Sequence, residues 1–260
     1  MNVIAIDFTG IYENEGFTFL TGDKSSRLVL NEDTFYASFK DVTGTNCICD
    51  DYACEEIKKR LRELDINKYK VRFFDSGNYH YMSKLLIDLM CEDNNDKFDE
   101  FDIIMFDHHP DMKWTSYGDI LSCGSWVLNA LKDHEEIGRV YIIGADEKLI
   151  SEVVQENPEY AKRVAFLHDI DELEKYEITN VYLSIDKDVI SDSELATNWD
   201  QGNMSIERLR HCLDELKKRF SDRILAVDVC GECMPDDERL FTDIGITASN
   251  AVNSMIIDSF

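Results

Sequence analysis

The sequence predicts an α/β fold with three layers, in which helices cover both faces of a mostly parallel central sheet. Short apolar runs alternate with amphipathic stretches along the chain, as expected for repeated strand–helix units. The apolar runs are continuous rather than alternating with polar residues, which is typical of parallel strands covered on both faces. No Pro/Gly/Ser-rich linker divides the chain, so we expect a single domain over residues 1–260.

The apolar, β-rich runs predict seven strands, in the order VIAIDF (3–8), VRFFD (71–75), DIIMFD (102–107), VYIIG (140–144), VAFL (164–167), VYLSID (181–186) and ILAVDV (224–229). Apolar residues at helical spacing predict helices over residues 54–64, 79–90, 124–134 and 205–220. The pattern of residues 9–50 is weaker, and it indicates a hairpin or an insertion.

The composition excludes some classes of function. The net charge of −26, from 53 acidic and 27 basic residues, argues against a nucleic-acid partner and favours a surface that attracts cations. No apolar run approaches the roughly 18 residues of a membrane span, so no membrane partner is expected. The N-terminal residues do not resemble a secretion signal, which predicts a cytoplasmic protein whose 8 cysteines are reduced.

Four of the predicted strands share an unusual ending. Each has an aspartate at its last or next-to-last position, and these are Asp75, Asp107, Asp186 and Asp228. Ligands of open parallel α/β sheets bind outside the carboxyl ends of the strands, so these side chains are expected to converge on one crevice. Burying several carboxylates together is costly unless a cation compensates their charge. The endings therefore favour a cation site.

Three short clusters supply candidate ligands for such a site: GNYH (77–80), DHHPD (107–111) and SIDKD (184–188). The i, i+2, i+4 spacing within the second cluster puts alternate side chains on one side of an extended segment. Six ligands are too many for one tetrahedral zinc, and an oxygen-rich set favours two manganese or magnesium ions. The candidate ligands are His80, Asp107, His109, Asp111, Asp186 and Asp188.

These motifs resemble the arginase (ureohydrolase) family of the arginase/deacetylase fold. The matching segments are Gly77-Asn78-Tyr79-His80, Asp107-His108-His109-Pro110-Asp111 and Asp186-Lys187-Asp188. The resemblance implies an arginase-like α/β domain that binds two Mn²⁺ per chain through the six candidate ligands, with Asp107 and Asp186 bridging the metals. It also implies that Glu232, in Glu232-Cys233-Met234-Pro235, binds the guanidinium group of the substrate.

The sequence departs from the family at the Ser-Gly-Asn-x-His loop, which corresponds here to LSCGSWVL (121–128) and contains no histidine. We therefore expect a binuclear manganese-dependent hydrolase that cleaves a guanidinium C–N bond and releases urea. Its expected partner is a guanidine or an arginine within a peptide, as in peptide arginases, rather than free arginine. Asp111 is a candidate for accepting the proton of the attacking water, and His168 is a candidate for the missing proton shuttle.

Three alternatives remain open at this point. A metal-dependent amide hydrolase or deacetylase of the same fold would use one zinc, which the six-ligand set argues against. A non-catalytic arginase-like protein would keep the metals without the reaction. The Cys-x-x-Cys segment CGEC (230–233) is compatible with a redox function, although Glu232 inside it already has a proposed role.

Overall fold

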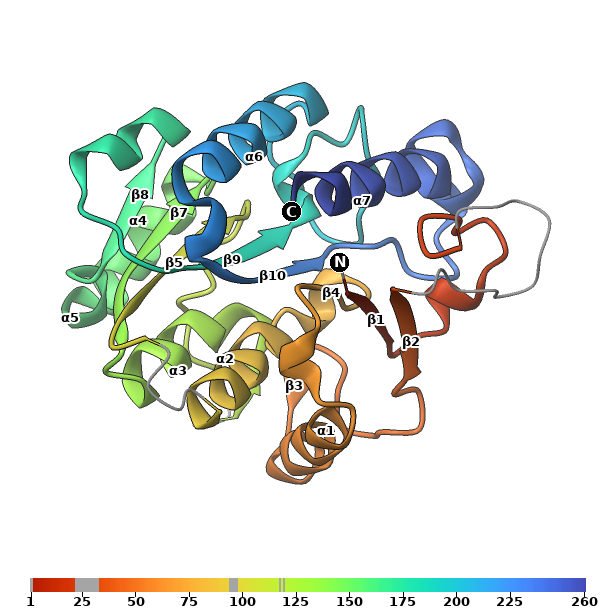
Figure 1. The fold of residues 1–260 in the computed structure, drawn as a ribbon, viewed down its shortest axis with the longest axis horizontal. Helices are drawn as coiled ribbons and strands as arrows, with labels where there is room; N and C mark the ends of the chain where they lie inside the picture. The colour runs from red at the N-terminus through yellow and green to blue at the C-terminus, as the bar shows by residue number, and fades with distance from the viewer. Residues whose placement is uncertain (1, 22–32, 94–97, 117, 119) are drawn as a thin grey trace.

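The computed structural model describes residues 2–21, 33–93, 98–116, 118 and 120–260. Its centre is an eight-stranded sheet with the order β2-β1-β4-β10-β9-β5-β7-β8, in which every neighbouring pair is parallel (Figure 1). The strands are β1 (Val3–Asp7), β2 (Thr34–Ser38), β4 (Val71–Phe73), β5 (Phe101–Phe106), β7 (Ile137–Ile143), β8 (Val164–Leu167), β9 (Val181–Asp186) and β10 (Ile224–Cys230). Two further strands, β3 (Ile48–Cys49) and β6 (Leu121–Ser122), form a separate antiparallel pair.

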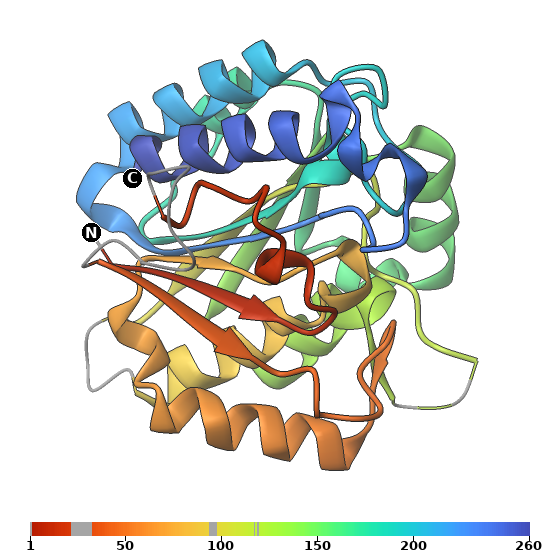
Figure 2. The same ribbon diagram turned by 90° about the vertical axis from the view of Figure 1, so that its right-hand side faces the viewer.

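Helices cover both faces of this sheet, which confirms the predicted three-layer α/β fold (Figure 2). One face carries α1 (Asp51–Glu63), α2 (Met82–Glu92), α3 (Trp126–Asp133) and α4 (Glu147–Glu156), followed by the short α5 (Pro158–Ala161). The other face carries α6 (Ile206–Phe220) and α7 (Ala248–Ser259). Because side chains alternate along a strand, Ile103 and Met105 enter one core while Ile104 and Phe106 enter the other.

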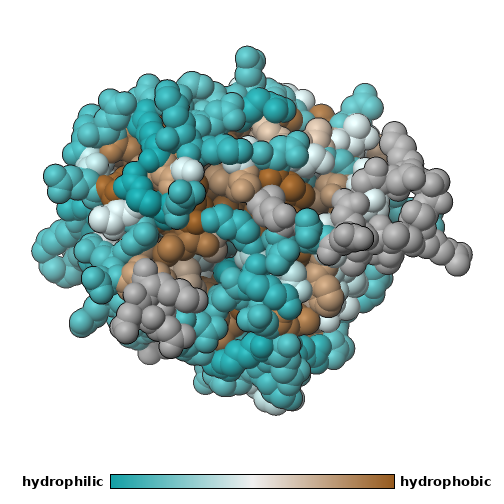
Figure 3. Space-filling view, viewed as in Figure 1, coloured by the Kyte–Doolittle hydropathy of each residue, from teal (hydrophilic) through white to brown (hydrophobic). Residues whose placement is uncertain are grey.

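The surface reflects the acidic composition. Hydrophilic residues cover most of the face seen in Figure 3, with smaller hydrophobic areas between them. Both cores are instead apolar and lie against the sheet, so the hydrophobic effect holds the three layers together. Within the described ranges, no helix combines the length and the hydrophobicity that a membrane span requires.

All seven predicted strands and all four predicted helices are present, with ends that shift by a few residues. The sequence pattern missed β2, which pairs in parallel with β1 and comes from the segment expected to be a hairpin or an insertion. Residues 22–32 of that segment lie outside the described residues. The sequence pattern also missed the helices α4, α5 and α7. The single domain over residues 1–260 stays a prediction.

The strand order decides where the functional side chains meet. Neighbours β4, β10, β9 and β5 form the middle of the sheet, and all run in the same direction. The segments that follow them therefore emerge at one edge, which is where open α/β sheets bind ligands. The predicted clusters at residues 77–80, 107–111 and 184–188 all belong to these segments.

Asp102, near the start of β5, is a buried carboxyl whose protonation affects the stability of the fold. Asp102 is 6% exposed and accepts a hydrogen bond from the backbone N–H of Arg139, at 2.7 Å. Burial raises the pKa of Asp102 to about 6. Its pKa in the unfolded chain is about 3.9, so the folded state favours the neutral form, and the associated stability is lost as the pH rises from about 4 through about 6.

We expect Asp102→Asn to be more stable than the unmodified protein at pH 8, by about 1–2 kcal/mol, and equally stable at pH 4. The reason is that asparagine stays uncharged and can accept the same hydrogen bond. Urea denaturation at the two pH values measures the effect, with the exposed Asp99→Asn as the matched control. Equal stability of the two proteins at both pH values would contradict the assigned pKa of Asp102.

Candidate metal centre

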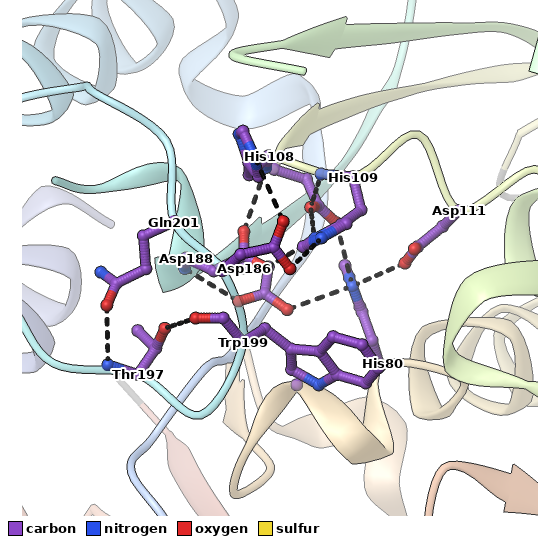
Figure 4. Close-up of polar contacts among 12 residues, drawn as sticks. His80, His108, His109, Asp111, Asp186, Asp188, Thr197, Trp199 and Gln201 are labelled. Atoms are coloured by element: carbon purple, nitrogen blue, oxygen red, sulfur yellow. Dashed lines mark hydrogen bonds and ion pairs between the residues drawn. The ribbon is translucent and has the colours of Figure 1, made fainter. Parts of the chain in front are cut away.

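The structure brings the six predicted ligands together at the carboxyl edge of the sheet (Figure 4). His80 follows β4, after the short turn Gly77–Tyr79 and just before α2. The next three ligands lie in the segment after β5, and the last two lie at the end of β9 and in the turn that follows it. Together they line a cavity of about 80 Å³, and they are His80, Asp107, His109, Asp111, Asp186 and Asp188.

His80 is the centre of the first ligand group. Its Nδ1 atom lies 3.1 Å from Oδ2 of Asp107, 2.9 Å from Oδ2 of Asp111 and 3.5 Å from Oδ2 of Asp186. A single N–H can donate well to one of these oxygens but not to all three. The same four atoms would each contribute a lone pair to a cation placed among them, with His80 in its neutral form.

His109 is the centre of the second ligand group. Its Nδ1 atom lies 2.9 Å from Oδ2 of Asp188 and 3.6 Å from Oδ1 of Asp107. Asp107 thus directs one carboxylate oxygen toward each histidine. Asp107 therefore belongs to two groups of candidate ligands and would offer one oxygen to a cation held by each group.

Burial and the charges of neighbouring groups shift the pKa of all six candidate ligands. Burial, reinforced by Asp111, raises the pKa of Asp107, and burial with the charge of Asp107 raises the pKa of Asp188 to about 6. Burial alone would lower the pKa of His109, but its contacts with Asp107 and Asp188 raise it to about 12. The carboxylates therefore favour the protonated forms of the two imidazoles, His80 and His109.

A divalent cation pair satisfies this cluster better than protons do. Oδ2 of Asp107 is buried and accepts no hydrogen bond from the described residues, although Nδ1 of His80 lies nearby. The four aspartates carry a charge of −4 when ionised, which two divalent cations offset. Carboxylate oxygens with a few imidazole nitrogens suit manganese, and the residues present therefore fit two such ions.

Surrounding groups hold the ligands in place. Nε2 of His80 lies 3.0 Å from Oγ of Ser184, which donates a hydrogen bond to Asp228 at 2.7 Å. Nε1 of the fully buried Trp126 donates to Oδ2 of Asp111 at 2.8 Å. Partners of this kind fix the orientation of metal ligands and tune their basicity. Asp228 thus serves the centre through Ser184 rather than as a ligand.

Asp75, the remaining strand-ending aspartate, has a different role. Its carboxylate accepts hydrogen bonds from the backbone N–H groups of Phe8 and Thr9, at 2.9 Å and 2.8 Å, and from the hydroxyl of Thr9. It therefore anchors the loop after β1 instead of facing the cavity. Burial, together with Asp7, raises the pKa of Asp75 to about 7.

Two predicted catalytic residues are not brought to the cavity. His168 is exposed and lines a separate hollow with His108 and Asp146, because β8 lies at the end of the sheet. Glu232 is 1% exposed and forms a buried ion pair with Lys187, at 2.5 Å between Oε1 and Nζ. The structure thus gives no support to His168 as a proton shuttle, and it gives Glu232 a partner inside the protein.

Sequence reasoning missed several residues at the centre. Ser184 shares a strand face with Asp186, and the two-residue spacing could have indicated it. Trp199 gives no such signal, since it reaches the cavity from the loop between β9 and α6 (Figure 4). The hydrogen bond from Trp126 to Asp111 likewise leaves no periodic pattern in the sequence. Cys230 donates to Oδ2 of Asp186 at 3.1 Å.

The thiols of the Cys-x-x-Cys segment have separate partners. Cys230 contacts Asp186, whereas Cys233 donates to the backbone carbonyl of Ala196 at 3.0 Å. Both cysteines are free. The segment therefore contributes two buried thiols, each with its own partner, beside the candidate metal ligands. This arrangement does not support a redox function for the Cys-x-x-Cys segment.

Fold and site together define a parallel α/β protein with an acidic cluster of candidate metal ligands at the carboxyl edge of its sheet. No known family profile matches the sequence, and no curated protein sequence matches it. Solved structures do match across nearly the whole chain. Formimidoylglutamase from Bacillus subtilis has a TM-score of 0.66 at 14% identity, covering 99% of this chain and 86% of that one.

Two further structures agree with this result. Agmatine ureohydrolase from Thermoplasma volcanium has a TM-score of 0.67 at 14% identity, covering 99% of this chain and 89% of that one. Arginase from Helicobacter pylori has a TM-score of 0.65 at 16% identity, covering 100% and 99%. The chain therefore has the arginase/ureohydrolase fold, and the resemblance noted in the sequence is confirmed at the level of the fold.

The shared carboxylate leads to a first test of the centre. We expect the unmodified protein to bind about two manganese ions per chain, and Asp107→Asn to retain less than one, because both ligand groups lose an oxygen. Elemental analysis after reconstitution and desalting measures the metal content. The exposed Asp192→Asn serves as the matched control. Full metal content in Asp107→Asn would show that this carboxylate is not a shared ligand.

Trp126→Phe tests the support of Asp111. The change removes the indole N–H donor but keeps an aromatic ring in the core, so we expect manganese affinity to fall by about 10–100-fold. Competition with a coloured chelator measures the affinity. Trp114→Phe, a partly buried tryptophan that packs against the same core without touching the ligands, is the control. Equal affinities of the two variants would mean that the hydrogen bond to Asp111 is unimportant for metal binding.

Proposed function

We propose that the protein is a manganese-dependent hydrolase of the arginase/ureohydrolase family, which cleaves a C–N bond other than a peptide bond in a guanidine or a related amide. The observation that carries this proposal is the pair of ligand groups that share Asp107. The fold supports it, since the similar structures include an arginase, an agmatine ureohydrolase and a formimidoylglutamase.

One metal would be held by His80, Asp107, Asp111 and Asp186, and the other by Asp107, His109 and Asp188. The family resemblance implies that Asp186 also contributes to the second metal. Two divalent cations, when bound, act as Lewis acids that lower the pKa of water toward neutrality. Hydrolysis then adds the hydroxyl group of water to the carbon and a proton to the leaving nitrogen. This requires a group that carries the proton between the two positions.

Other residues around the cavity would accept the proton, orient a metal ligand and form a wall of the substrate pocket. Asp111 is our candidate for accepting the proton of the attacking water, because Trp126 holds it facing His80. Ser184 and Asp228 orient the imidazole of His80 from behind. Trp199 lines the cavity, and its Nε1 donates to Oδ1 of Asn78 at 3.0 Å, which fixes the indole as one wall.

The proposed substrate is not free arginine. The segment that replaces the family's Ser-Gly-Asn-x-His loop contributes Cys123 and Gly124 to the cavity lining. Neither side chain offers the charged or amide groups that would recognise an α-amino and an α-carboxylate group. This supports the proposal that the substrate is a simpler compound or a residue within a peptide.

The two competing readings fit less well. A deacetylase-like site with one zinc would not use Asp111 and Asp188 as metal ligands, although both carboxylates are buried and each faces a histidine. A non-catalytic metal-binding protein would not need an open pocket beside the metals, whereas the ligands here line a cavity that also reaches Trp199. The experiment below distinguishes both readings from the proposed function.

We expect protein reconstituted with manganese to release urea, ammonia or an amine from at least one member of a panel of guanidines, ureas, simple amides and arginine-containing peptides. Activity should be lost in Asp107→Asn and should be weak on free L-arginine. Colorimetric urea and ammonia assays give the readout. Efficient hydrolysis of L-arginine would refute the substrate proposal, and two bound metals without any turnover would favour a non-catalytic protein.

A further inference from the structure

Lys187 lies between two metal ligands, yet its side chain points away from the cavity into the protein. It is fully buried, and its Nζ atom contacts three acceptors. These are Oε1 of Glu232 at 2.5 Å, Oγ of Ser249 at 2.9 Å and Oδ1 of Asn253 at 3.1 Å. An ammonium group has three N–H donors, so this lysine is fully satisfied inside the chain.

Glu232 is equally well satisfied. Besides the contact with Lys187, its carboxylate accepts hydrogen bonds from Nδ2 of Asn253 at 2.8 Å and from Oγ of Ser249 at 2.5 Å. The hydroxyl of Tyr12 adds a fourth contact at 3.4 Å. An external cation could reach this carboxylate only by displacing Lys187, which would leave a buried ammonium without its partner.

The ion pair between Lys187 and Glu232 lies next to the turn that carries two of the candidate metal ligands. Lys187 stands between Asp186 and Asp188, and Gly231 precedes Glu232. A Cβ atom on Gly231 would lie 2.5 Å from Oδ1 of Asp186 and 2.7 Å from the backbone nitrogen of Lys187. Gly231 also has a φ of +95°, which favours glycine. The two segments are thus closely packed, and the ion pair is well placed to fix the turn that carries both aspartates.

Among the described residues that line the rest of the cavity, no other carboxylate is available to a cationic substrate. Apart from the ligands, the lining consists of Gly77, Cys123, Gly124 and Trp199. A hydrogen bond with Cys47, reinforced by burial, raises the pKa of Cys123 and keeps that thiol neutral. Asp200 contacts Nε2 of His109, at 3.2 Å, but its side chain is 72% exposed, where water screens its charge.

Charge balance leads to the same conclusion. The four ligand aspartates contribute −4 and two divalent cations would contribute +4, so the aspartates would be neutralised by the metals. Among the described lining residues, no further carboxylate remains to pair with a cationic substrate. We propose that the ammonium group of Lys187 takes the place of an external cation at the carboxylate of Glu232. The metal pocket therefore takes a substrate whose reacting group is uncharged, such as a urea or an amide. The substrate part of this proposal rests on the proposed function and narrows it.

The occupancy of Glu232 can be tested without any turnover. Lys187→Ala removes the internal cation and leaves space beside Glu232. We expect this variant to bind ethylammonium and guanidinium at low millimolar concentration, and to melt at a higher temperature in their presence. The unmodified protein and the double variant Lys187→Ala/Glu232→Gln should show neither effect. Calorimetry and thermal melts of the manganese-loaded proteins give the readout.

Two results would overturn the proposal. One is a folded Lys187→Ala that gains no affinity for either cation. The other is guanidinium binding by the unmodified protein that disappears in Glu232→Gln, since this would show that Glu232 is open to an external cation. If Lys187→Ala does not fold, Lys187→Ser, which also leaves space beside Glu232 and offers a hydroxyl to the polar cluster, replaces it in the same titrations.

The substrate class is tested with isosteric pairs, for example an alkylurea against the alkylguanidine of the same length, and a citrulline peptide against the matching arginine peptide. Water adds across the same C–N bond in each pair, so only the charge of the reacting group differs. We expect kcat/KM to favour the uncharged member by about tenfold or more. Preference for the guanidines would overturn the substrate claim. Absence of turnover on both members would refute the proposed function, while the cation titration would still decide the role of Lys187.

Discussion

Four buried aspartates at one edge of a sheet are the constraint on which the rest of the structure depends. Asp107, Asp186 and Asp188 are each at most 3% exposed, and Asp111 is 8% exposed. Isolated carboxylates at such depth would either bind protons or destabilise the fold. Here their oxygens point toward one another and toward two imidazoles, so a pair of divalent cations would turn mutual repulsion into coordination.

The parallel sheet makes this concentration of charge possible. Because β4, β10, β9 and β5 run in the same direction, the segments after them converge without long excursions of the chain. The strands themselves stay apolar and bury both faces under helices, so the cost of the polar edge is offset by the cores below it. Hydrogen bonds from Trp126 and Ser184 then connect the ligands to those cores.

The sequence predicted the ligands because their spacing is local. Asp107, His109 and Asp111 follow one strand, and the two-residue period of an extended chain is sufficient to place them on one side. The strands were also predictable, since their apolar runs are short and rich in β-branched and aromatic residues, which favours strands over buried helices. Helix α7 was missed because its buried face includes the polar residues Ser249, Asn253 and Ser259, so its pattern shows little contrast between an apolar and a polar side.

What sequence reasoning could not give were contacts between distant segments. Nothing in the pattern around Lys187 shows that its side chain meets Glu232, 45 positions later, and that Ser249 and Asn253 complete the cluster. The same holds for His168, whose strand end looked suitable but lies at the far end of the sheet order. Long-range pairing of buried charges depends on the folded arrangement of the chain and leaves no periodic signal in the sequence.

The central feature of the protein is a carboxylate, Asp107, that serves two ligand groups at once. Diffraction from crystals soaked with manganese, with data collected at the manganese absorption edge, tests this feature most directly. The structure predicts two anomalous peaks about 3.5–4 Å apart, one beside His80 and one beside His109, each in contact with Asp107. A single peak, or two peaks that do not share Asp107, would contradict the two-metal centre.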